Sequence, residues 1–339
     1  MFDDALLDDP TALGAADEVL RRLAQAGARV RIELESTESL LAQLADHDRP
    51  RAVVAAGTDA RLIRALLEPV CPVPFVAWPQ PGLPGWVGAL DLVVVLAADA
   101  ADAGLLATVH ETVRRGARLL IACPDPSVVA DHAGSSSTTL IPTRTADTLA
   151  AAVVVLAGLH AARLGPPVDP ERVAAAMDQI AEDCSPYADI SVNPAKDLAL
   201  GLAESQPLIW GGSVLAARAS RRIAESLRAA TGRPALAADA EALLPLLEST
   251  QARDPFADPY EQAGSDRTPV LVVLDDGYES VRHDRNRLVA AAERVDLRVC
   301  PVSHQHGSDV ERYAALLQTG LYAAVYLALG LGRYHTDQT

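Results

Sequence analysis

The chain has 339 residues, enough for two domains of ordinary size, and 50% of them are hydrophobic while 22% are charged. This composition is typical of a folded protein and excludes a largely disordered one. The net charge of −16 would repel a phosphate backbone over most of the surface, so we expect no nucleic-acid partner. An anionic metabolite would need a local site made of helix N-termini, hydroxyl groups or single arginines.

The first half of the chain alternates short runs of β-branched residues with alanine- and leucine-rich helical stretches. The runs are apolar on both faces, which is typical of strands in a parallel sheet with right-handed crossovers. Strands are predicted at 51–57, 74–78, 90–97, 117–123 and 137–142, and helices at 9–27, 58–68 and 102–116.

The same alternation begins again in the second half. Two helices separated by "GPPVDP" (165–170) mark the change, so we place the boundary near 165–169 and predict domains at 1–165 and 166–339. A helix at 193–205 follows, with Asn193 as its N-cap and Pro194 in its first turn. Further strands are predicted at 207–212, 233–237, 270–276 and 297–303. The fold class is therefore α/β, with two parallel sheets in tandem, each flanked by helices.

Ligands of open parallel sheets bind where strands end and helices begin, which directs attention to a few loops. Arg144 follows a strand and precedes a helix, where it could bind a phosphate or simply balance Asp147. Other candidates combine backbone N–H groups with a hydroxyl, although a structural turn and helix cap would explain them too. These candidates for binding are Gly57, Thr58, Gly211, Gly212 and Ser213.

Histidines and cysteines give no clear metal or redox site. His304 and His306 have the spacing of two metal ligands, but no third ligand is evident, so loop histidines are the alternative and no metal is predicted. The four scattered cysteines form no CxxC pair, so we expect free, buried thiols. We expect no cofactor. The uncharged run at 313–332 predicts a buried helix rather than a membrane span, and the absence of a signal sequence predicts a cytoplasmic protein.

The stretch "NPAKDLALGLAESQPLIWGGSVLAARASRRIAESL" (193–227) resembles the SIS-domain (sugar isomerase) superfamily, and within it the bifunctional phosphoglucose/phosphomannose isomerases. "DPFADP", "VLVVLDDG" and "YAAVYLALGLG" resemble a divergent, TobH-like branch. The resemblance implies two SIS subdomains, a homodimer with sites at the subunit contact, and aldose–ketose isomerisation of a phosphorylated sugar. Such chemistry needs a glutamate base, a ring-opening histidine, hydroxyls for the phosphate and an arginine.

The sequence departs from that family where the chemistry should lie. Arg144 matches the family's arginine, but 96–104 lacks the serine-rich phosphate loop. The family's polar triplet with the glutamate base corresponds to 228–230, which read Arg-Ala-Ala, and 241–249 lacks the histidine. The resemblance therefore favours a degenerate homologue that binds a sugar phosphate weakly or not at all.

Two alternatives remain open. An active isomerase of hexose 6-phosphates would use Arg144 with Glu225, one turn before Ala229, and His304 or His306. The other alternative is a non-catalytic interaction protein of sugar-phosphate metabolism. Lys196, the only lysine, stands near a helix N-terminus, where the helix dipole disfavours a cation. We expect it to reach a carboxylate across a domain or dimer contact in a structural role, with contact to a ligand as the alternative.

Overall fold

The computed structural model describes residues 2–35, 37–45, 48–57, 60–98, 103–250 and 268–334. Two compact units divide the chain: one is Ala26–Ala175, and the other joins Met1–Gln25 to Ala176–Thr339. The division differs from the predicted domains because the N-terminal residues pack with the C-terminal unit. Leu7 and Leu20 bury their side chains there, and the backbone N–H of Asp3 donates to Gly330 (2.7 Å).

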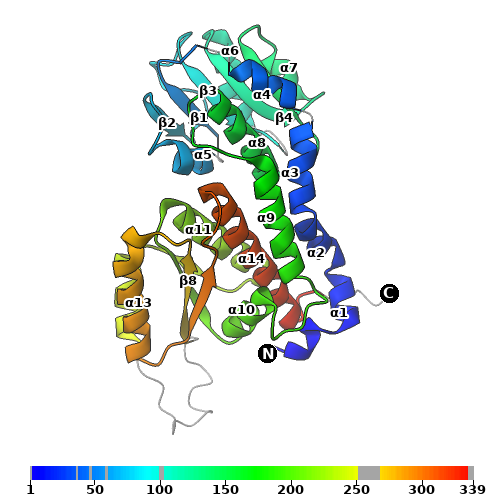
Figure 1. The fold of residues 1–339 in the computed structure, drawn as a ribbon, viewed down its shortest axis with the longest axis vertical. Coiled ribbons are helices and arrows are strands. Elements are labelled where there is room, and N and C mark those ends of the chain that lie inside the picture. Colours follow the sequence, from blue (N-terminus) through cyan, green and yellow to red (C-terminus); the bar gives the residue numbers. More distant parts are fainter. Residues whose placement is uncertain are drawn as a thin grey trace. The chain divides into compact units, whose positions relative to one another are not determined.

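The unit Ala26–Ala175 is built on a five-stranded parallel sheet with the order β2-β1-β3-β4-β5 (Figure 1). Its strands are β1 (Val53–Ala56), β2 (Phe75–Trp78), β3 (Leu92–Leu96), β4 (Arg118–Pro124) and β5 (Thr138–Thr143). Its helices are α3 (Ala26–Glu35), α4 (Glu38–Leu44), α5 (Ala60–Leu67), α6 (Ala103–Arg114), α7 (Val128–Ala133) and α8 (Thr148–Ala161).

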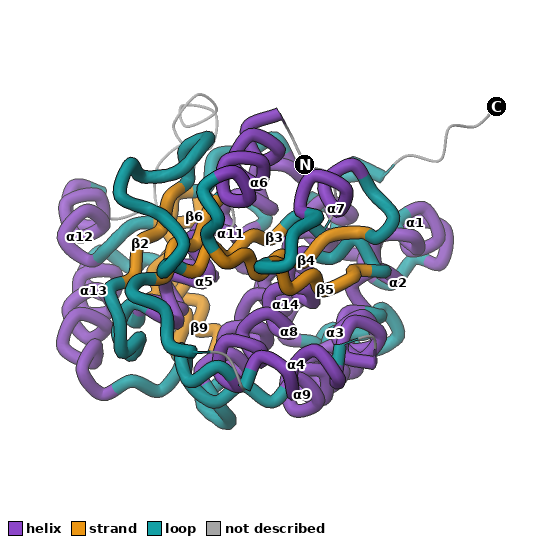
Figure 2. The backbone as a smooth tube through the Cα atoms, turned by 90° about the horizontal axis from the view of Figure 1, so that it is seen from above, coloured by secondary structure: helices purple, strands orange, loops and turns teal. Residues whose placement is uncertain are grey.

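Helices cover both faces of this sheet. Val95 and Ile121 lie in one apolar cluster with Val109 of α6 and Val129 of α7, while α8 contacts β3 and β4. Figure 2 shows α6 and α7 on one side of β3, β4 and β5, and α8, α3 and α4 on the other. Helix α8 has ten buried residues because it is apolar around its whole circumference.

The second unit contains a four-stranded parallel sheet with the order β7-β6-β8-β9. Its strands are β6 (Gln206–Gly211), β7 (Leu236–Ala237), β8 (Pro269–Asp275) and β9 (Val299–Ser303). The N-terminal segment contributes η1 (Asp4–Leu7), α1 (Pro10–Ala15) and α2 (Asp17–Ala24), and α9 (Pro170–Asp183) passes from one unit to the other. The remaining helices are α10 (Pro194–Leu202), α11 (Val214–Thr231), α12 (Ala240–Ser249), η2 (Glu279–Val281), α13 (Arg282–Arg294) and α14 (Asp309–Gly330).

The core of this unit again lies on both sides of the sheet. Leu208, Trp210 and Val273 pack with apolar residues of α12 and α13, and Figure 1 shows α13 beside β8. Helix α14 packs against both α10 and α11. By length and composition α14 could cross a membrane, but 94% of its most apolar window is buried inside the protein. The prediction of a buried helix at 313–332 is confirmed.

The predicted α/β class and both parallel sheets are also confirmed. Every strand lies inside its predicted range or differs from it by one residue. The predicted helix 9–27 is instead two helices, α1 and α2, separated at Ala16, and α2 ends before Gln25. All four cysteines are free, and the three that are buried have a raised thiol pKa because burial disfavours the thiolate.

Candidate functional site

The carboxyl edge of the first sheet contains two of the predicted site residues, Gly57 after β1 and Arg144 after β5. Thr58 lies outside the described residues. Gly57 has φ +92°, and a Cβ there would stand 3.0 Å from Leu105 Cδ1, so the turn itself requires glycine. Because β3 and β4 separate β1 from β5, three strand spacings of roughly 4.8 Å place Gly57 and Arg144 at least about 14 Å apart. They do not form one compact anion site.

The loop after β5 is held by a glutamate that the sequence analysis missed. Glu33 of α3 is fully buried, and its two carboxylate oxygens accept the backbone N–H of Arg144, each at 3.1 Å. The backbone N–H of Thr145 donates to the same carboxylate (2.8 Å), and the Thr145 hydroxyl donates as well. The Arg144 side chain is exposed.

This arrangement decides what the loop can bind. Consecutive backbone N–H groups with a neighbouring hydroxyl, just before a helix, are the usual cradle for a phosphate. Here Glu33 occupies those donors, and Asp147, the N-cap of α8, accepts the N–H groups of Leu149 and Ala150. Arg29 balances Asp147 at 2.7 Å. Carboxylates of the protein thus take the place that an external anion would need.

The carboxyl edge of the second sheet contains the Gly211–Gly212–Ser213 turn, between β6 and α11. A Cβ at Gly211 would overlap the backbone of Ala216, so glycine lets the helix approach the strand end closely. Ser213 is the N-cap of α11, and its Oγ accepts the N–H of Ala216 at 3.0 Å. The Ser213 hydroxyl donates a hydrogen bond to the Asp276 carboxylate.

Asp276 gives this edge an acidic character. Its side chain is only 4% exposed, and it follows Asp275 at the end of β8. Arg285 and Gln305 Nε2 donate to the Asp275 carboxylate, the latter at 3.0 Å. The turn that resembled an anion cradle therefore has its hydroxyl directed at a buried carboxylate, which would repel a phosphate.

The two loop histidines lie close to this edge but are not equivalent. His304 is half-buried and its backbone N–H donates to the Asp275 carbonyl (2.9 Å), whereas His306 is exposed. Burial lowers the pKa of His304, and the nearby His306 and Arg312 lower it further. Within the described residues, no group of three or more His, Cys, Asp or Glu side chains could hold a metal ion.

The predicted substitute base, Glu225, lies on an exposed part of α11. Its carboxylate pairs with Arg222 at 3.1 Å, and both side chains are about half exposed. At the position of the family's polar triplet, Arg228 donates to the Ala235 carbonyl (2.7 Å) and Ala229 is exposed. Among the described residues, no interaction joins Glu225 to His304 or His306. This unit alone does not assemble a base and a histidine.

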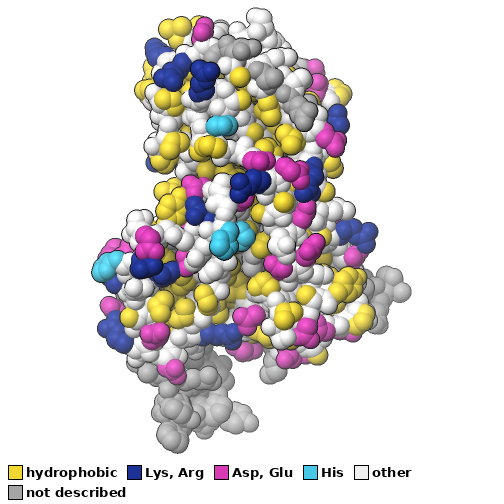
Figure 3. All heavy atoms as spheres, viewed as in Figure 1, with side chains coloured by type: hydrophobic (Ala, Val, Ile, Leu, Met, Phe, Trp, Pro, Cys, Tyr) yellow, Lys and Arg dark blue, Asp and Glu magenta, His cyan; other side chains and the backbone are white. Residues whose placement is uncertain are grey.

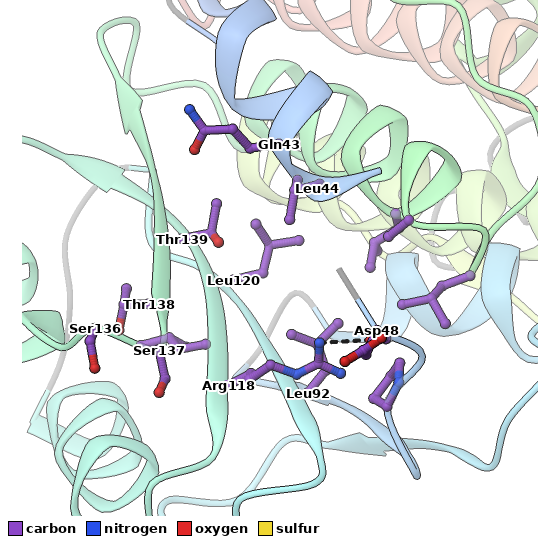
Figure 4. Close-up of a pocket in the computed structure, with 15 residues that line it drawn as sticks. Gln43, Leu44, Asp48, Leu92, Arg118, Leu120, Ser136, Ser137, Thr138 and Thr139 are labelled. Carbon is purple, nitrogen blue, oxygen red and sulfur yellow. Dashed lines mark hydrogen bonds between the residues drawn. The ribbon is translucent and has the colours of Figure 1, made fainter. Parts of the chain in front are cut away.

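One pocket, of about 370 Å³, lies at the opposite, amino edge of the first sheet (Figure 4). It contains none of the predicted site residues. Its lining comes from the starts of β3, β4 and β5 and from the C-terminal ends of α4 and α8.

The architecture described above consists of two α/β units, each with a parallel sheet flanked by helices. Residues 191–336 match the family of bacterial phosphoglucose isomerase C-terminal SIS domains, which confirms the resemblance read from "NPAK" onward. The family match thus lies within the second unit. Over these residues the chain is similar to the C-terminal SIS domains of bacterial phosphoglucose isomerases.

Solved structures show the same fold over nearly the whole chain. Tagatose-6-phosphate ketose/aldose isomerase from Escherichia coli superposes with a TM-score of 0.67 at 13% identity, covering 94% of each chain. The C-terminal domain of glucosamine-fructose-6-phosphate aminotransferase from Francisella tularensis gives a TM-score of 0.63 at 11% identity, covering 92% of this chain and 96% of that one. Comparison with curated proteins gives no significant match.

Proposed function

We propose that this protein is a degenerate phosphosugar isomerase homologue, which does not isomerise hexose phosphates and binds them weakly or not at all. The observation that carries the proposal is the buried Glu33 carboxylate on the N–H groups of Arg144 and Thr145. Asp276, which accepts the Ser213 hydroxyl, supports it at the second sheet. Both places suited to a phosphate thus already hold negative charge.

The proposal also covers the location, oligomeric state and partners of the protein. It acts as a cytoplasmic homodimer without metal or cofactor, in sugar-phosphate metabolism and not on nucleic acid or a membrane. On the face drawn in Figure 3, acidic and basic side chains are interspersed and the described atoms form no extended basic patch, which agrees with this choice of partners.

An isomerase assay tests the catalytic part. Each positioned acid or base contributes roughly 100- to 10,000-fold, so loss of both glutamate and histidine predicts turnover at least about 10⁴-fold below that of an active enzyme. Glucose 6-phosphate and mannose 6-phosphate would be supplied separately, with fructose 6-phosphate formation measured by coupling. Turnover near that of an active isomerase, lost in an Arg144→Ala variant, would instead establish the active alternative.

A melting-temperature titration tests the binding part. The melting temperature of the wild-type protein is expected to rise by less than 1 °C in roughly 5 mM of either sugar phosphate. A ligand raises stability appreciably only when its concentration exceeds its Kd, and weak binding does not meet that condition. An Arg22→Ala variant, changed at an exposed arginine of α2, is the control for Arg144→Ala. A larger shift that disappears only in Arg144→Ala would overturn weak binding and indicate a sugar-phosphate sensor.

A further inference from the structure

The pocket at the amino edge of the first sheet lies at the end of the strands opposite to Gly57 and Arg144. Leu92 and Arg118 are the first residues of β3 and β4, and Ser136 and Ser137 directly precede β5. Its volume of about 370 Å³ falls within the range of small-molecule sites, roughly 300–1,000 Å³. Whatever it binds would not compete for the edge where the SIS relatives predict a sugar phosphate.

The floor of the pocket is apolar. Leu120 of β4 and Leu44 of α4 lie between its polar ends in Figure 4. Both are almost fully buried, as are Leu159 and Leu164 of the segment that ends α8. An apolar body lying on these leucines would be removed from water at roughly 25 cal/mol per Å².

The polar groups are placed asymmetrically around this floor. Arg118 is half-buried, and its Nη1 donates to the Asp48 carbonyl (2.7 Å), which holds the side chain at one end of the pocket (Figure 4). The remaining N–H groups of its guanidinium have no partner among the described residues. Gln43 and Thr139 stand at the other end of the leucine floor. A planar guanidinium held in this way matches a carboxylate.

Among the described residues that line the pocket, Arg118 is the only cation. Asp48 is the one acidic residue among those lining the pocket, and its side chain is exposed. The C-terminal end of α8, which also faces the pocket, carries partial negative charge, but Ala162, Arg163 and Leu164 donate their N–H groups to its last carbonyls. One fixed cation above an apolar floor selects a ligand with one charge and a hydrophobic body.

We propose that this pocket binds a small carboxylate with an apolar body, its carboxylate on Arg118 and its hydrocarbon part on Leu44 and Leu120. The site differs in place and in ligand chemistry from the sugar-phosphate edge. It is the binding site of a second class of metabolite on this SIS fold.

Calorimetric titration of the full chain tests the proposal with three probes. Hexanoate has both features, hexan-1-ol has only the apolar body, and glucose 6-phosphate has the anion without the apolar body. We expect hexanoate to bind at least tenfold more tightly than hexan-1-ol, and glucose 6-phosphate to produce no heat at this site. In Arg118→Gln, hexanoate is expected to lose that tenfold advantage while hexan-1-ol changes less than twofold.

Two further variants keep the test decisive. Arg114→Gln changes an exposed arginine of α6 that does not line the pocket, and it should leave hexanoate binding unchanged. Ala162→Phe fills the pocket from the half-buried end of α8 and should abolish binding of both hydrocarbon probes. This variant tests the site even if Arg118→Gln does not fold. Equal affinity for hexanoate and hexan-1-ol, no binding of hexanoate at 10 mM, or unchanged binding in Ala162→Phe would each overturn the proposal.

Discussion

The only lysine of the chain places its ammonium group among three oxygen atoms, one for each of its protons. Lys196 Nζ donates to Asp8 Oδ1 (2.6 Å) and to the carbonyls of Pro186 (2.9 Å) and Ala188 (3.0 Å). The side chain is fully buried and lies 5.7 Å from the ring centre of Tyr326. The dipole of α10 disfavours a cation near its N-terminus, and these four partners offset that cost. Its contacts within the unit are structural.

A Lys196→Met variant measures what this arrangement contributes. Methionine retains much of the volume but leaves two carbonyls without a donor, so we expect the free energy of unfolding to fall by about 1–3 kcal/mol. Urea denaturation followed by circular dichroism gives the value. Arg21→Met, which breaks the exposed pair with Asp17, should cost only about 0.5 kcal/mol or less. Equal losses in the two variants would contradict a structural role for Lys196.

Sequence patterns could indicate that Lys196 needed an acidic partner, but not which one. Asp8 is 188 positions away, and it is one of 45 acidic residues. The same limit applies to Glu33, which looks in the sequence like any other acidic residue and yet is fully buried against a loop 111 residues later. Local periodicity carries no information about such distant pairs, because only the tertiary fold brings them together.

At the scale of single elements, local signals were sufficient for the strands and for several helix ends. Asn193 caps α10 through the N–H groups of Ala195 and Lys196, as the sequence predicted. Helices α3 and α4 were not predicted, since "RVRIELESTESLLAQL" mixes β-branched residues with charges. Their helical state depends on packing against α8, and propensity is only a weak guide in such cases.

The junction of β6 with α11 provides a test at this scale. A methyl group at Gly211 would overlap the Ala216 backbone, which cannot move without shifting α11, so Gly211→Ala should destabilise the protein by about 1–3 kcal/mol or more. Gly14→Ala is the matched control, because that glycine lies in α1 with open space around it and should gain up to about 1 kcal/mol. Thermal unfolding distinguishes the two. A neutral Gly211→Ala would show that this glycine is not needed for packing.

At the scale of the whole molecule, the first 25 residues complete the C-terminal unit rather than the sheet that follows them in sequence. A Cβ at Gly330 of α14 would overlap the Phe2 ring, so the two approach closely, and Gln318 donates to the Leu23 carbonyl at 3.1 Å. The Pro- and Gly-containing segment at 165–170 precedes the point between Ala175 and Ala176 where the chain passes from one unit to the other. The sequence of this segment could not show that the N-terminal residues pack with the C-terminal unit. That packing depends on matching apolar surfaces that lie far apart in the sequence.

Deletion of Phe2–Asp9 should therefore destabilise the C-terminal unit and leave the stability of the unit Ala26–Ala175 nearly unchanged. The deletion removes fully buried Leu7 and the carboxylate partner of Lys196, so we expect a loss of roughly 3 kcal/mol or more in the C-terminal unit. Trp210, which is 3% exposed in the core of that unit, reports its unfolding when Trp78 and Trp86 are replaced by phenylalanine. Trp78 reports the other unit when Trp210 and Trp86 are replaced. The urea midpoint should fall strongly in the first background and by less than about 0.3 M in the second, whereas equal shifts in both would mean that the two units unfold as one.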